Sequence, residues 1–168
     1  MKRKFVHLSL FIGLLASVAC SNYGTTSRTA KGIKSIHVPF FENLTTEPNL
    51  EIIVTESVID NLVEDNTLRV SNRDVADAIL EGKIVRFDSG PISFNQDLNA
   101  EEYRVIIRVN VTLYNRRTQE PIWSDKILTG DGNYFVENTG GGQTIDGAIS
   151  ESIQEITDRI LNLTVQDW

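Results

Sequence analysis

Cysteine and histidine are almost absent from this chain, which holds one cysteine and two histidines in 168 residues. A single thiol cannot form an internal disulfide. With only His7 and His37 available, a tetrahedral zinc site or a catalytic triad built on histidine is excluded in practice. The carboxylates are plentiful, but the sequence places no partner beside any of them. We therefore predict that the protein is not an enzyme and that it binds no metal and no cofactor.

Positive charge is also scarce, with 16 Lys and Arg residues against 23 Asp and Glu residues. The first 20 residues contain three basic residues and no acidic one, so 13 basic and 23 acidic residues remain after them, a net charge of −10. This balance argues against nucleic acid as a partner and against a broad contact with an anionic membrane. An anionic lipid or sugar would have to bind at a local basic patch.

The N-terminus has the layout of a secretory signal. Three basic residues, 2–4, precede an apolar run, 5–19, that is too short to span a bilayer, which takes about 20 apolar residues. The lone Cys20 follows this run, where cleavage is expected, and its thiol can accept a diacylglycerol. Ser17 replaces the usual leucine, so an ordinary signal peptide with an incidental cysteine is the alternative. Ser21 after the cysteine favours sorting to the outer membrane.

We divide the chain into a signal peptide over 1–19, a lipidated tether over 20–32 and a single domain over 33–168. The tether is rich in Ser, Thr and Gly, which is typical of a flexible linker. The domain is long enough for one hydrophobic core, and it contains no internal repeat.

Alternating apolar and polar residues predict strands, and apolar residues three and four positions apart predict helices. In chain order we expect a strand over 33–40, a helix from Pro48 to about Val63, a short strand at 68–70, strands over 77–87, 103–114 and 121–135, and a helix over 145–163. We expect 88–91 to break the strand before it and 92–101 to be a loop or a weak extension of the hairpin. In the strand over 121–135, we expect Trp123 and Ile127 to be packed, and Gly130 and Gly132 to loosen its end.

The long strands follow one another through short turns, which favours antiparallel pairing. We therefore predict an α+β fold, a two-layer sandwich in which a mainly antiparallel four-stranded sheet carries two amphipathic helices on one face.

The other face of that sheet is the informative surface. If the alternation over 103–114 holds, Arg104 and Arg108 point away from the helices, and Lys83 and Lys126 on the neighbouring strands join them. These four residues form a predicted basic stripe, which would suit an anionic ligand. The alternative is that they are only the solvated side of a half-exposed sheet.

The stretch from Ile36 to Glu51 (IHVPFFENLTTEPNLE) resembles the LptE family of lipopolysaccharide-assembly lipoproteins, and so do 20–24 (CSNYG), Thr55-Glu56, 78–82 (AILEG) and the strand with Trp123. The resemblance covers nearly the whole chain after the signal. It implies a non-enzymatic lipoprotein at the inner leaflet of the outer membrane. Such proteins plug the β-barrel translocon LptD, help it assemble and contact lipopolysaccharide.

The resemblance also implies that basic residues meet the phosphates of lipopolysaccharide, whereas the choice of Lys83, Arg104, Arg108 and Lys126 comes from strand geometry. A strand that ends in Pro39-Phe40 with Asn43 and Thr45 after it is similar as well to curli-secretion and penicillin-binding-protein-activator lipoproteins. In that alternative the protein would regulate a cell-wall enzyme or form part of a secretion pore.

Overall fold

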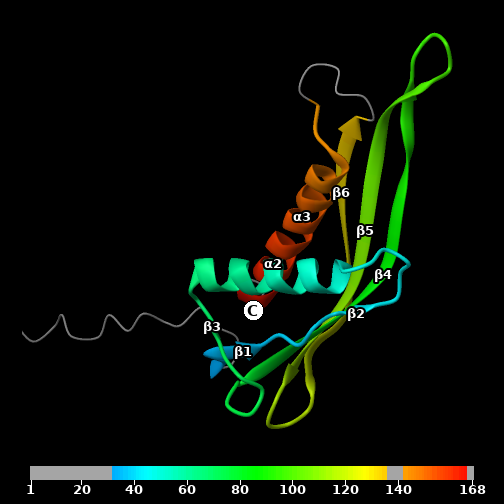
Figure 1. Ribbon diagram of the computed structural model, residues 1–168. Coiled ribbons are helices and arrows are strands. Elements are labelled where there is room, and N and C mark those ends of the chain that lie inside the picture. Colours follow the sequence, from blue (N-terminus) through cyan, green and yellow to red (C-terminus); the bar gives the residue numbers. More distant parts are fainter. Residues whose placement is uncertain (1–31, 136–141, 166–168) are drawn as a thin grey trace, which may run out of the picture.

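The computed structural model describes residues 32–135 and 142–165 (Figure 1). In chain order the elements are β1 (Ser35–His37), β2 (Glu42–Asn43), α2 (Leu50–Asp65), β3 (Arg69–Val70), β4 (Ala78–Phe94), β5 (Ala100–Asn115), β6 (Pro121–Phe135) and α3 (Ile145–Val165). The predicted signal peptide and Cys20 lie outside the described residues, as does the predicted tether except for Gly32.

Six strands form one mixed sheet in the order β3-β1-β4-β5-β6, with β2 also paired to β4. The long strands β4, β5 and β6 pair antiparallel, whereas β1 runs parallel to β3 and β4, and β2 runs parallel to β4. The α+β fold with two helices is confirmed, but the sheet is mixed and has six strands, so the predicted four strands do not match it exactly. Helix α2 is a crossover that returns the chain in parallel. The predicted strands at 33–40 and 68–70 correspond to β1 and β3, whereas β2, with two residues, is too short to show alternation.

Both helices lie on the same side of the sheet (Figure 1). Helix α2 buries a row of residues four apart, namely Leu50, Val54, Val58 and Leu62. Ile53 and Val63 also fit the three- and four-residue apolar spacing that predicts this helix, yet they are 43% and 59% exposed. The face that α2 presents to the core is therefore narrower than the sequence pattern predicts.

Strand β4 continues through the predicted break at 88–91 and ends only at Phe94. Pro91 is tolerated there because no described strand pairs with the outer edge of β4 beyond Ile84, so its missing N–H is not needed. Register shifts between Ile84 and Arg86 and around Ser93 bend the strand instead of ending it. The result is a long β4–β5 hairpin that projects beyond the rest of the sheet (Figure 1).

The prediction that Gly130 and Gly132 loosen the end of β6 is wrong. The two glycines instead allow α3 to lie directly on the strand. A Cβ atom at Gly130 would lie 1.9 Å from the carbonyl oxygen of Ser152, and one at Gly132 would lie 2.3 Å from that of Ala148. Ser152 and Ala148 are themselves fully buried. Small residues on both sides therefore bring the helix backbone against the strand backbone.

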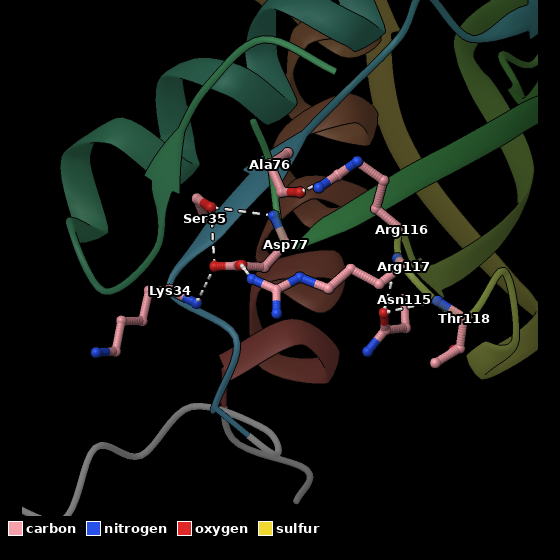
Figure 2. Close-up of polar contacts among 8 residues, drawn as sticks. All are labelled: Lys34, Ser35, Ala76, Asp77, Asn115, Arg116, Arg117 and Thr118. Carbon is pink, nitrogen blue, oxygen red and sulfur yellow. Dashed lines mark hydrogen bonds and ion pairs between the residues drawn. The ribbon is translucent and has the colours of Figure 1, made fainter. Parts of the chain in front are cut away.

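Asp77 joins three segments of the chain at the end of the sheet where β1 begins (Figure 2). Its Oδ2 accepts hydrogen bonds from the backbone N–H of Lys34 (3.0 Å) and the hydroxyl of Ser35 (2.9 Å). Its Oδ1 lies 3.8 Å from the guanidinium of Arg117, and its carbonyl oxygen accepts a bond from the N–H of Arg116 (2.9 Å). The N–H of Lys34 is the largest of the causes that hold the pKa of Asp77 below its usual 3.8.

Candidate ligand-binding face of the sheet

The face of β4, β5 and β6 that points away from the helices is called the open face below. Arg104 and Arg108 lie on it, as the alternation predicts, because they alternate on β5 with Val105, Ile107 and Val109, which are fully buried. Both arginines are partly exposed. The orientation predicted for these two residues is therefore confirmed.

Lys83 lies on the same face, on the neighbouring strand. It pairs with Asn110 of β5, six residues beyond Arg104, so the distance along the strand from Arg104 to Lys83 is about 20 Å. Its amine lies 2.8 Å from the carboxylate of Glu42, and this hydrogen bond raises the pKa of Lys83. Lys83 is therefore a cation whose charge is already paired with the carboxylate of Glu42.

Arg86 joins the open face, although the sequence alternation puts it on the core side. The register shift between Ile84 and Arg86 makes Val85 an extra residue, and Arg86 then pairs with Arg108. Two guanidinium groups thus lie opposite each other on adjacent strands. No sequence signal marks this bulge. Together Lys83, Arg86, Arg108 and Arg104 are called the basic row.

Lys126 does not belong to the basic row, so this part of the predicted stripe is wrong. Its partner on β5 is Val111, which is fully buried on the helix side of the sheet. Because paired residues project from the same face, the side chain of Lys126 leaves the backbone on the helix side. The cause is a second bulge at Asp125, whose φ of 53° lies in the left-handed region. The same shift turns Ile127 outward, where it is 65% exposed instead of packed as predicted, while Trp123 still contacts the core.

The arginines of the basic row are held in place by polar neighbours. Arg104 Nε donates to Asn133 Oδ1 at 2.9 Å and lies 3.6 Å from the carboxylate of Asp131. Arg108 Nε donates to the hydroxyl of Thr129 at 3.3 Å. Within the described part of the chain, the terminal nitrogens of Arg108 have no hydrogen-bond partner. A guanidinium held through Nε presents a planar pair of donors that matches a phosphate.

A groove of about 390 Å³ lies at the Lys83 end of the open face. Phe40, which is 68% exposed, forms one wall, and Thr112 and Tyr114 of β5 contribute to its lining. The charged residues around it are Glu42, Arg73, Glu81, Lys83 and Asp125. Three carboxylates and two basic side chains line the groove, so the groove itself does not favour a phosphate. At the Arg86–Arg108 level of the face, Arg86 is ion-paired with Asp88, so Arg108 is the guanidinium there whose terminal nitrogens are available to a phosphate.

The described residues contain no group of three or more His, Cys, Asp and Glu side chains that could hold a metal ion. The ring Nδ1 of His37 lies 3.1 Å from the carbonyl oxygen of Ser71, so this histidine links β1 to a loop. None of the helices in the described ranges is long and apolar enough to cross a membrane.

The sequence model of the LptE family, described as lipopolysaccharide-assembly, matches residues 33–164. This span contains every strand of the sheet and nearly all of α3. The chain belongs to the LptE family. No match was found among curated protein sequences.

Solved structures share the fold of this LptE-family chain at low sequence identity. Protein XCC0632 from Xanthomonas campestris is 11% identical, with a TM-score of 0.57 over 82% of this chain and 89% of its own. The hypothetical protein CT253 from Chlamydia trachomatis is 11% identical, with a TM-score of 0.55 over 78% and 95%. The uncharacterized lipoprotein B from Nitrosomonas europaea is 12% identical, with a TM-score of 0.51 over 87% and 92%. At these identities the likeness concerns the fold alone.

The residues that resemble the LptE family build the loop between β2 and α2. Asn43 Oδ1 accepts hydrogen bonds from the N–H (3.0 Å) and the hydroxyl (2.8 Å) of Thr45. Asn43 Nδ2 donates to the carbonyl of Glu47 (2.8 Å) and to the carboxylate of Glu51 (2.9 Å). One asparagine side chain therefore organises the whole turn that leads into the helix.

Phe41 from the same stretch fixes the helix to the sheet. Its ring is buried against Gly82 of β4, and its N–H donates to the hydroxyl of Thr55 on α2 at 3.0 Å. That hydroxyl in turn donates to the carbonyl of Glu51 at 2.6 Å. The family-like stretch in this LptE-family chain thus has a structural role, and its Glu42 also pairs with Lys83 at one end of the basic row.

Proposed function

We propose that this protein is a lipid-anchored component of the outer membrane that plugs the lumen of the translocon barrel LptD, assists its assembly and contacts lipopolysaccharide. The observation that carries the proposal is the match of the LptE family over 33–164, which is the whole folded domain. The role is one of assembly and binding, without catalysis.

The projecting β4–β5 hairpin suits insertion into a larger partner. Three apolar side chains gather near its tip, where Ile92, Phe94 and Leu98 are 43%, 57% and 83% exposed. An exposed apolar group of this kind marks an interaction site. A narrow two-stranded projection can enter a barrel lumen that would not admit the two-layer body.

The experiment that tests the barrel proposal is co-purification of the tagged full chain from outer membranes. We expect a detergent-resistant complex with a large β-barrel, and we expect Phe94→Asp with Leu98→Asp to weaken it. Val63→Asp, which changes an equally exposed apolar residue on α2, is the matched control and should leave the complex intact. Absence of the barrel, together with binding to a peptidoglycan synthase or a secretion pore, would replace this proposal with the alternative.

Contact with lipopolysaccharide is assigned to the basic row. Arg86 and Arg108 face each other, and Arg104 lies further along the same strand, so the phosphates of one lipid can meet several guanidinium groups. We expect Arg104→Glu with Arg108→Glu to weaken lipopolysaccharide binding at least tenfold, since charged hydrogen bonds contribute about 1.5–3 kcal/mol each. Binding is measured by titration of the purified chain with lipopolysaccharide.

The matched control for a single charge reversal is Lys126→Glu, because Lys126 extends from the other side of the sheet. Arg108→Glu should weaken lipopolysaccharide binding, whereas Lys126→Glu should leave it unchanged. Equal effects of the two variants would show that only net charge matters and would remove the basic row from the proposal. Acylation of Cys20 is tested separately by mass spectrometry of the mature N-terminus, where a free thiol would contradict the anchor.

A further inference from the structure

The end of the domain opposite the hairpin tip is rich in basic residues. It is formed by the starts of β1 and β3 and by two loops, 71–77 and 116–120 (Figure 1). Four basic residues, Lys34, Arg69, Arg116 and Arg117, lie there with three acidic ones, Asp74, Asp77 and Glu120. Arg73, also in the loop 71–77, is paired with Glu81 and lines the groove on the open face. This surface, called the basic end, therefore has a small excess of positive charge on a chain that is otherwise strongly acidic.

Backbone and side-chain contacts place several of these residues beside one another. Ser35 pairs with Arg69, and the N–H of Arg69 donates to the carbonyl of Lys34 at 3.0 Å. Asp77 binds the backbone of Lys34 and lies 3.8 Å from Arg117 (Figure 2). The basic end is thus one connected surface, and not a set of distant charges.

Two of these cations have no partner for their charge. Among the described residues, neither the amine of Lys34 nor the guanidinium of Arg69 makes an ion pair or hydrogen bond, and both residues are exposed. The Lys34 side chain points away from the Asp77 contacts (Figure 2). Arg117 is 76% exposed and only loosely paired. Val75, at 64% exposure, adds an apolar side chain to the same end.

The short length of chain between Cys20 and the first strand indicates that the basic end faces the membrane that holds the anchor. Eleven residues separate Cys20 from Gly32, a span of at most about 40 Å when extended and about 20 Å on average for a flexible linker. The described chain then continues directly into Lys34. The basic end is therefore the part of the domain that an anchor at Cys20 holds nearest to the bilayer.

The negative charge on the rest of the domain does not prevent such a contact. Charges in solution are screened over about 8 Å at physiological ionic strength. A strand of 17 residues such as β4 is about 56 Å long, so the far end of the hairpin lies several screening lengths away. The charges within about one screening length of the surface therefore dominate the interaction.

We propose that the basic end docks on the phosphate groups of anionic phospholipids in the membrane that carries the anchor, so that the β4–β5 hairpin points away from that surface. The proposal rests on the lipid anchor of the proposed function. It concerns the state before any barrel is bound, and the domain leaves this orientation when the hairpin enters the lumen. Each Lys or Arg near an anionic surface strengthens binding about fivefold.

The single cysteine allows a test that does not depend on natural acylation. The mature chain is coupled through Cys20 to a maleimide lipid in vesicles of phosphatidylcholine, with or without phosphatidylglycerol. The labelling rate of each lysine by a water-soluble amine reagent is then measured by peptide mass spectrometry. We expect labelling of Lys34 to fall roughly fivefold in the anionic vesicles and to recover in 1 M salt, where screening acts over about 3 Å. Labelling of Lys83 and Lys126 should not change.

Two charge-matched double variants identify the surface. Arg69→Gln with Arg117→Gln should restore the labelling of Lys34 in anionic vesicles, whereas Arg104→Gln with Arg108→Gln should leave it protected. Equal labelling of Lys34 in the two kinds of vesicle would overturn the proposal, as would an equal effect of the two variants. Neither result bears on the barrel complex or on lipopolysaccharide titration, so failure here is distinct from failure of the proposed function.

Discussion

Gly82→Ala probes the contact that fixes the family-like loop to the sheet. Gly82 is buried in β4, and a Cβ atom there would lie 2.2, 2.4 and 2.5 Å from three ring carbons of Phe41, well inside the 3.4–4 Å of ordinary contact. Phe41 is 2% exposed, so its ring has no free space to enter. We expect the added methyl group to lower the free energy of unfolding by about 1–3 kcal/mol, as overpacking of a core does.

The matched control is Gly90→Ala in the same strand. No atom lies within 4 Å of the Cβ position at Gly90, and its φ is not positive. This variant should be as stable as the parent or more stable by about 0.4–1 kcal/mol, because alanine reduces the freedom of the unfolded chain. Urea unfolding gives both values from the shift in midpoint at constant slope.

A double-variant cycle with Phe41→Leu separates the steric clash from other effects. Leucine is smaller, so Gly82→Ala should cost less in the Phe41→Leu background, with a coupling energy of about 0.5–3 kcal/mol. Equal stabilities of the Gly82→Ala and Gly90→Ala chains would refute the packing argument. Strict additivity in the cycle would show that Phe41 is not the group that the methyl meets.

Three further variants test polar contacts, all by urea unfolding. Thr55→Val should lose about 1–3 kcal/mol, because it leaves the buried N–H of Phe41 without an acceptor. Asn43→Ala should lower the free energy of unfolding by at least about 1 kcal/mol, the net contribution of one to two hydrogen bonds. Its control is Leu44→Ala, which changes an exposed residue of the same loop. Asp77→Asn should be less stable than the parent at neutral pH. Because folding lowers the pKa of Asp77, its contribution is present above 3.8 and disappears as the pH falls through the folded pKa, so the two chains should converge in acid. A gap that stays constant with pH would contradict this assignment.

The sequence could predict those features that depend on short, regular spacing. The alternation on β5 identifies both its buried row and the open-face position of Arg104 and Arg108. The apolar spacing of α3 identifies a helix whose residues Ile153, Ile156 and Ile160 are buried. These patterns are readable because side-chain direction follows from the period of one element alone.

The misplaced residues share one physical cause, which is that a bulge changes the parity of a strand. The extra residue Val85 moves Arg86 onto the open face, and the extra residue Asp125 removes Lys126 from it. A bulge is an extra residue on one strand opposite a single residue of the partner strand. Alternation counted along one strand alone therefore cannot reveal it. Candidate site residues close to a bulge therefore need the register of the neighbouring strand.

By itself, the sequence determined the class of protein, the two helices, the three long strands and two arginines of the candidate site. Only the tertiary structure decided the parallel pairing of β1 with β4, the close approach of α3 to Gly130 and Gly132, and the third arginine, Arg86, in the basic row. The division has a physical reason. Local periodicity is encoded in consecutive residues, whereas strand order, register and backbone contact depend on segments that meet only when the chain is folded.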